Sequence, residues 1–191
     1  MSSASIALVQ AVVLVEGLSD QLALEALAAR RHRNLVAEGI AIIPMGGVTN
    51  ITGFLRRYGP QGENLRLAGL CDVGEVGMVQ RGLELSGLGA GLGRAEMEAI
   101  GFHVCVEDLE DELIRALGAE AVEAVIEAHG ELDRFRKFQK QPQWRLRSTE
   151  AQLRRFFGTY RGRKIQSAPM LVDALDLENV PGPLDAVLAQ I

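Results

Sequence analysis

Val12-Val13-Leu14-Val15-Glu16-Gly17-Leu18-Ser19-Asp20 is the stretch that decides the fold expected of this chain. Its first four residues form an apolar run, and the run ends in an acid. Such a run is typical of a strand that is buried on both faces of a parallel sheet. Leu67-Ala68-Gly69-Leu70-Cys71-Asp72 repeats the pattern further along. The two stretches predict strands that deliver carboxylates to the carboxyl edge of a sheet, where open α/β sheets place their ligands.

The residues around these two stretches alternate between strand and helix patterns, as in βαβ units. We expect strands over 11–16, 40–44, 66–71 and 102–106. We expect helices over 19–32, 48–58, 76–86, 94–99, 109–117 and 119–129, with Ser19 and Asp108 as N-caps. Beyond residue 130 the pattern is helical, over 131–140, 148–157, 164–175 and 182–190. The predicted fold class is α/β, a small parallel Rossmann-like sheet flanked by helices, with a helical C-terminal extension.

Charge divides the chain at the same place. Residues 1–130 carry 9 Arg, no Lys and 18 acids, whereas residues 131–164 carry 11 Lys or Arg and 3 acids. We therefore expect an α/β domain over 1–130 and a basic helical part over 131–191, packed on it as one structural unit. An acidic body with a basic segment suits a protein that binds cations at one place and polyanions at another. Solvated helix faces are the alternative interpretation of the same charges.

Composition excludes several other classes of protein. The hydrophobic fraction of 48% allows a full core, and no apolar run reaches the roughly 18 residues that a spanning helix needs. The N-terminus lacks the basic start of a secretory signal. Cys71 and Cys105 fall in predicted buried strands, so a disulfide framework is not indicated. We expect a soluble cytoplasmic protein without membrane contact.

The motifs resemble a known family. Glu16-Gly17-x-Ser19-Asp20 after an apolar strand, and Asp72 at the end of a later strand, resemble the Toprim domain of topoisomerases, primases and related nucleases. Asp108-Leu109-Glu110 and Gly162-Arg163-Lys164 point to the Toprim module of the overcoming-lysogenisation-defect (OLD) nucleases, over roughly residues 10–175. Longer members carry an ATPase domain before this module, so the resemblance is to a stand-alone form.

Cleavage of a phosphodiester needs charge neutralisation on the phosphate and an activated water, which one or two Mg²⁺ or Mn²⁺ ions supply. Hard cations prefer carboxylate oxygens. The resemblance implies catalytic roles for Glu16 and Asp72 and charge stabilisation by Lys164. The expected metal ligands are Glu16, Asp20, Asp72, Glu75 and Glu110. Each acid also has a structural reading, as a loop acid or an acid in the first turn of a helix.

The position two residues after Asp72, where the family pattern has a second acid, is Gly74 here. Glu75 follows it and has a longer side chain that can substitute. This departure leaves open one metal or two, and it leaves open a reduced activity.

The basic segment supplies candidates for contacts with nucleic acid, expected to be DNA rather than RNA. These are Lys137, Lys140, Arg145, Arg147, Arg154, Arg155 and Arg163. Trp144 could stack on bases. The predicted function is a metal-dependent DNA endonuclease, a hydrolase. The alternative is a catalytically weak metal- or nucleotide-binding Toprim module that acts with a separate ATPase partner. A homo-oligomer is left open.

Overall fold

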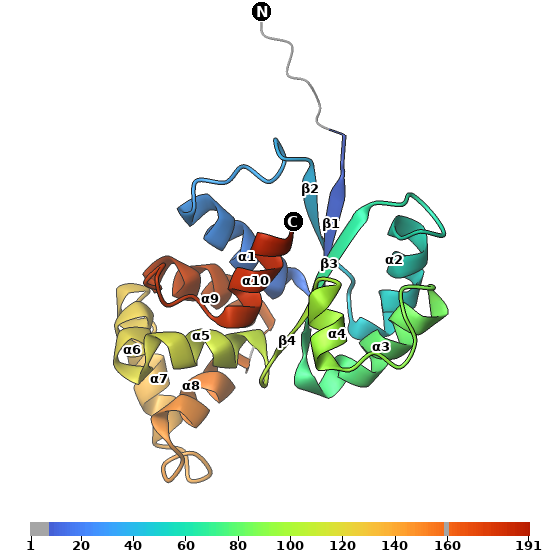
Figure 1. Ribbon diagram of the computed structural model, residues 1–191. Helices are drawn as coiled ribbons and strands as arrows, with labels where there is room; N and C mark the ends of the chain where they lie inside the picture. The colour runs from blue at the N-terminus through green and yellow to red at the C-terminus, as the bar shows by residue number, and fades with distance from the viewer. Residues whose placement is uncertain (1–7, 159–160) are drawn as a thin grey trace, which may run out of the picture.

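Four parallel strands form one sheet in the order β2-β1-β3-β4. The structure, a computed structural model, describes residues 8–158 and 161–191, apart from the side chain of Arg161. Figure 1 shows the sheet running through the middle of the molecule. The strands are β1 (Ala11–Val15), β2 (Ile40–Pro44), β3 (Arg66–Asp72) and β4 (Phe102–Cys105). The predicted α/β class and all four predicted strands are confirmed, with ends that differ by one residue at most.

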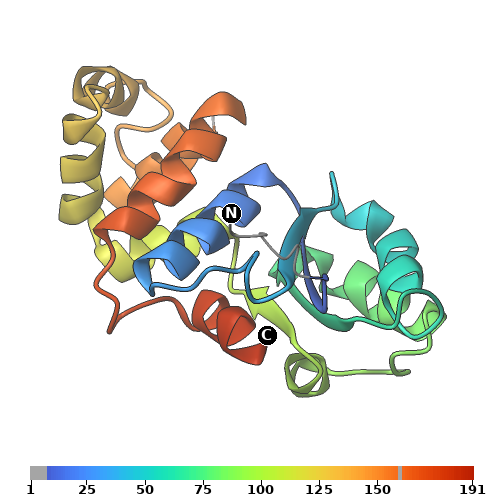
Figure 2. The same ribbon diagram turned by 90° about the horizontal axis from the view of Figure 1, so that it is seen from above.

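Side chains of β1 alternate between two buried clusters, one on each face of the sheet. Val13 and Val15 belong to the cluster formed with α1 (Leu18–Arg30), α9 (Arg161–Ala174) and α10 (Gly182–Gln190). Val12 and Leu14 belong to the cluster formed with α2 (Ile51–Tyr58) and α3 (Val76–Leu85). Figures 1 and 2 show these two groups of helices on opposite sides of the sheet. The continuous apolar run of β1 therefore reflects burial on both faces.

The remaining elements follow the predicted order. They are η1 (Val48–Asn50), η2 (Val73–Glu75), α4 (Arg94–Ala99), α5 (Leu109–Leu117), α6 (Ala119–Ala128), α7 (Leu132–Gln139) and α8 (Thr149–Gly158). The segment predicted as one helix over 48–58 consists of the 3₁₀ turn η1 followed by α2. The helix predicted over 164–175 begins three residues earlier, and Pro169 lies inside it. None of the helices formed by the described residues is long and apolar enough to cross a membrane.

The prediction of Ser19 as an N-cap is wrong. Helix α1 begins at Leu18, its N-cap is Gly17, and Ser19 is buried in its first turn. The Asp20 carboxylate reaches back and accepts a hydrogen bond from the Gly17 N–H, at 2.8 Å. The helix therefore begins without a capping hydroxyl, and Asp20 at its third position binds the N–H of the N-cap residue. Asp108 was predicted as the N-cap of α5 and is confirmed, since its Oδ1 accepts from the Asp111 N–H at 2.8 Å.

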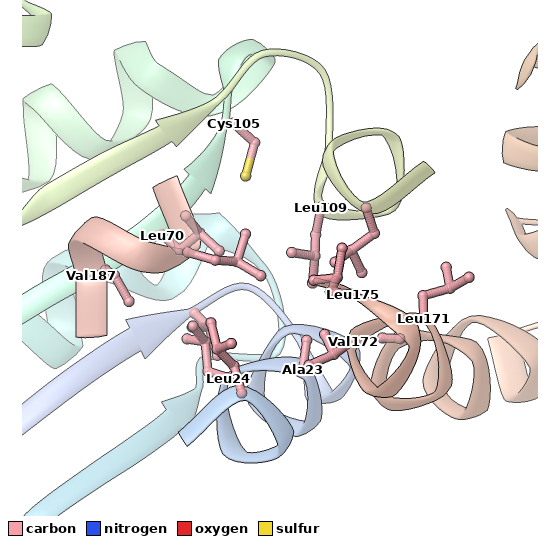
Figure 3. Close-up of a cluster of buried hydrophobic side chains, with 14 of the residues drawn as sticks. Ala23, Leu24, Leu70, Cys105, Leu109, Leu171, Val172, Leu175 and Val187 are labelled. Carbon is pink, nitrogen blue, oxygen red and sulfur yellow. The ribbon is translucent and has the colours of Figure 1, made fainter. Parts of the chain in front are cut away.

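The C-terminal helices share a core with the sheet. Figure 3 shows Leu24 of α1, Val172 of α9 and Val187 of α10 in one buried cluster with Leu70 of β3, and Leu171 of α9 belongs to the same cluster. Leu24, Leu171, Val172 and Val187 are each fully buried. Burial of a leucine side chain stabilises a fold by about 2–3 kcal/mol. Residues on both sides of position 130 belong to this cluster, so we expect them to unfold together.

Candidate metal centre at the carboxyl edge of the sheet

Glu16 and Asp72 lie at the ends of two neighbouring strands. From β1 the chain passes to β2 on one side, and β3 lies on the other side of β1. The change of direction makes the space between the ends of β1 and β3 a topological switch point, where open α/β sheets form a crevice. The register pairs Leu14 with Gly69, which places Glu16, two residues later, close to the level of Asp72. The fold thus brings the two predicted acids to one edge.

Glu75 completes a group of three carboxylates at this edge. One oxygen each from Glu16, Asp72 and Glu75 lie within 4.8 Å of one another; we call these residues the triad. Glu75 reaches the other two because η2 turns the chain sharply after Asp72. Its buried Oε2 has no hydrogen-bond partner among the residues that the structure describes. Asp20 lies near enough to raise the pKa of the two later acids of the triad.

Two acids of the triad, Asp72 and Glu75, have raised pKa values. Burial, with Asp20 and Asp108 nearby, raises the pKa of Asp72 to about 8. Burial and the neighbouring Glu16 raise the pKa of Glu75 to about 7. Carboxylates that are crowded and partly buried cannot all ionise without a compensating positive charge. A bound divalent cation would supply that charge.

A second acidic group faces the C-terminal helices. Glu110 is only 3% exposed, and one of its oxygens lies 3.0 Å from Lys164 Nζ. Its buried Oε1 has no hydrogen-bond partner within residues 8–158 and 161–191. Burial raises the pKa of Glu110 to about 7, although Lys164 opposes the rise. Burial also raises the pKa of Asp20, again against the effect of Lys164. Lys164 therefore pairs with one predicted metal ligand, Glu110, and acts electrostatically on a second, Asp20.

Asp108 is committed to structure rather than to a ligand. Its Oδ1 caps α5, and its Oδ2 accepts hydrogen bonds from Arg154 Nη2 at 2.9 Å and Arg154 Nε at 3.1 Å. Arg154 Nη1 also lies 3.3 Å from Glu107. These contacts join α8 to the segment between β4 and α5. They were missed from the sequence, because 46 residues separate Arg154 from Asp108 and no local spacing marks the pair.

The predicted nucleic-acid contacts fall into three groups. Arg154 and Arg163 form intramolecular ion pairs, and Arg163 binds Glu131 and stacks at 4.1 Å over the ring of Phe156. Arg155 is exposed on α8. The rest of the group is exposed, and in the described part of the chain none of it forms a side-chain ion pair. We call these the four cations: Lys137, Lys140, Arg145 and Arg147.

Trp144 packs on Phe138, with ring centroids 5.4 Å apart. It is partly buried against the larger core cluster. The stacking surface that we expected Trp144 to offer to bases is therefore shared with Phe138.

The donor set fits a hard cation. The triad, Asp20 and Glu110 offer carboxylate oxygens, which Mg²⁺ and Mn²⁺ prefer. Two oxygens in this region, one each on Glu75 and Glu110, are buried without a partner among the described residues. Burial raises the pKa of Cys71 to about 12 and raises that of Cys105 as well. Burial thus favours the protonated form of both thiols.

Comparison with known proteins agrees with this fold. Residues 8–62 match the family model described as "Overcoming lysogenization defect protein-like, TOPRIM domain". The C-terminal region of the Xanthomonas campestris pv. campestris OLD protein has a similar structure, with a TM-score of 0.71 and 23% identity over 95% of this chain and 93% of that chain. The C-terminal region of the Burkholderia pseudomallei OLD protein gives a TM-score of 0.72 with 19% identity, over 95% of this chain and 96% of that chain.

These low identities show a shared fold. No curated protein gives a significant sequence match. The match over residues 8–62 suggests a metal-binding module of a nuclease family. The resemblance that the sequence predicts is confirmed: the chain is consistent with a Toprim domain of the OLD family.

Proposed function

We propose that this protein is a divalent-metal-dependent nuclease that hydrolyses phosphodiester bonds in DNA at the carboxyl edge of its sheet. The observation that carries the proposal is the triad, with one oxygen from each residue within 4.8 Å of the others and a buried, unpartnered oxygen on Glu75 in the described structure. The triad would hold one Mg²⁺ or Mn²⁺ ion, and Asp20 with Glu110 would hold a second. A bound ion would offset charge on the phosphate and lower the pKa of water.

The protein's own residues would then act on the substrate as follows. Glu16, at the end of β1, would accept the proton of the attacking water as a general base. Asp72 and Glu75 would orient the cation beside it. Lys164 would donate to the phosphate or to the leaving oxygen and stabilise the charge that develops there. An ammonium group carries three N–H donors, so the contact of Lys164 with Glu110 does not exhaust it.

A second candidate function is a catalytically weak metal- or nucleotide-binding module that acts with a separate ATPase partner. It is favoured by Gly74 at the usual position of the second acid and by the engagement of both Asp108 oxygens in structural contacts. Under this alternative the triad would still bind a cation, but purified protein would cleave DNA slowly or not at all.

A cleavage assay separates the two. Supercoiled and linear DNA would be incubated with protein and Mg²⁺, Mn²⁺ or Ca²⁺, beside Glu16→Ala and Asp72→Ala. We expect Mg²⁺ or Mn²⁺ to support cleavage and each variant to abolish it with unchanged circular dichroism, because acids at strand ends can be removed without opening a core cavity. Glu84→Ala, which removes an exposed acid from α3, is the matched control and should cleave normally. Full activity of Glu16→Ala or Asp72→Ala under strict metal control would refute the proposed site.

A further inference from the structure

The segment between α7 and α8, residues 140–148, is a turn held in one shape by a buried glutamine. Gln152 is 5% exposed, and its Nε2 donates to the carbonyl oxygens of Trp144 at 2.8 Å and Arg147 at 3.1 Å. Its Oε1 accepts from Gln139 Nε2 at 2.7 Å. The stacking of Trp144 on Phe138 adds a second attachment. We call residues 140–148 the basic turn.

The basic turn presents an apolar side chain between two positive ones. Leu146 is 88% exposed, more than any other large hydrophobic residue among those described. Arg145 and Arg147 flank it and are both exposed. Lys140 begins the turn, and Lys137 precedes it on α7. An isolated exposed leucine is ordinary on a protein surface, but here it stands on a structured turn among the four cations, which form no ion pair with the residues that the structure describes.

Helix α8 fixes the basic turn relative to the acidic edge. Gln152 holds the turn, and Arg154, two residues later on the same helix, pairs with Asp108 just after β4. In Figure 1 the loop between α7 and α8 projects toward the same side of the molecule as the loop after β4. The turn and the acidic edge are thus linked through one helix, and a polyanion bound at that edge would lie on the side of the molecule where the turn projects.

We propose that Leu146 is a wedge that inserts between base pairs of duplex DNA while the four cations hold the flanking phosphates. Proteins that distort DNA commonly insert leucine and other apolar side chains at base steps and thereby kink the duplex. The positive charge around Leu146 matches a phosphate backbone on each side. The proposal rests on the proposed function, and it adds to it a residue that would select flexible or already unstacked steps.

The test uses a short duplex that carries 2-aminopurine, whose fluorescence rises when the base unstacks, with Ca²⁺ replacing Mg²⁺. Wild type should bind the duplex and raise this fluorescence. Leu146→Ala should lose the rise while its affinity falls only about threefold to tenfold, because the phosphate contacts remain. Val36→Ala removes a side chain that is 77% exposed, in the segment before β2, and serves as the matched control. Circular dichroism should be unchanged in both variants.

Each other outcome counts against the wedge. Binding by wild type without a fluorescence rise, at any probe position, would overturn it and leave the proposed nuclease intact. An equal rise with Leu146→Ala would do the same. Absence of DNA binding by wild type would overturn both proposals. Leu146-dependent binding to vesicles that contain phosphatidylserine, without binding to DNA, would assign the turn to a lipid surface instead.

Discussion

Replacing Glu75 by glutamine should stabilise the metal-free protein and weaken its response to metal. The substitution keeps the shape of the side chain and removes one of three crowded charges. Burial and Glu16 raise the pKa of Glu75 from 4.5 to about 7. Between these values the folded state binds more protons than the unfolded state, so the free energy of unfolding of the wild type falls as pH rises. Glutamine does not titrate and escapes this loss.

The size of the effect follows from the change in pKa. A rise from 4.5 to about 7 corresponds to about 3 kcal/mol above pH 8. Partial exposure of Glu75 to solvent reduces this to about 1–2 kcal/mol. Glu75→Gln should therefore have a free energy of unfolding about 1–2 kcal/mol above that of wild type at pH 8, and within about 0.5 kcal/mol of it at pH 5.

Bound metal should make wild type more stable than Glu75→Gln, the reverse of the order in the metal-free proteins. A ligand at a hundred times its dissociation constant adds about 2.7 kcal/mol to stability. Mn²⁺ at pH 8 should raise the free energy of unfolding of wild type by this amount. It should raise that of Glu75→Gln by less, because the variant has lost a charged ligand. The assay is urea unfolding with a chelator or with Mn²⁺, and Glu84→Gln on α3 is the control. Lower stability of metal-free Glu75→Gln at pH 8, or an equal gain from Mn²⁺ in both proteins, would refute this account of the triad.

Four further outcomes are expected. Gly74→Asp should change Mn²⁺ affinity by less than about threefold in calorimetry, because Glu75 already supplies the carboxylate. The new side chain has room, since a Cβ at Gly74 meets nothing within 4 Å. A large gain in affinity would mean that Glu75 does not substitute for the missing acid. Mn²⁺ affinity should rise from pH 6 to pH 8.5, because Asp72 and Glu75, with pKa values of about 8 and 7, must lose their protons to bind a cation; a flat profile would contradict this. Leu171→Ala should cost about 2–5 kcal/mol and shift the transitions seen by Trp144 fluorescence and by far-ultraviolet circular dichroism together, whereas separate transitions would show that residues 131–191 unfold independently. Replacement of the four cations by glutamine should flatten the slope of log affinity for DNA against log salt by up to about 0.9 per lost phosphate contact; an unchanged slope would show that these side chains are only solvated.

The sheet and half of the candidate site were predictable because their causes are local. The runs that end in Glu16 and Asp72 are apolar without interruption, and only strands buried on both faces need that pattern. The carboxyl ends of parallel strands lie at the same edge of a sheet, so the proximity of Glu16 and Asp72 follows from the two strands alone. Glu75 was predicted from the sequence as a substitute for the acid that is missing at Gly74. The 3₁₀ turn after β3 places its carboxylate beside those of Glu16 and Asp72.

The rest depends on contacts between distant parts of the chain. The pairs of Lys164 with Glu110 and of Arg154 with Asp108 exist because α8 and α9 pack on the body through apolar side chains. Packing of this kind has no local signature. The sequence also did not show which of the predicted phosphate contacts remain available. A basic side chain that pairs with an acid from a distant part of the chain looks the same in the sequence as one that does not. At Ser19 residue preference failed for a local reason, since the helix already begins at Leu18 with Gly17 as its N-cap.

The position of α10 has a practical consequence for handling this protein. Gln190 donates to the Ala99 carbonyl, just before β4, and Arg33 donates to the carbonyl of Ile191 at 3.1 Å. The last helix therefore finishes at the end of the sheet where the strands begin, opposite the carboxylates. Residue 8 leads into β1 at that same end. An affinity tag or surface tether joined after Ile191 would start from the face away from the acids, so immobilised protein should present its acidic edge and basic turn freely to a long DNA molecule.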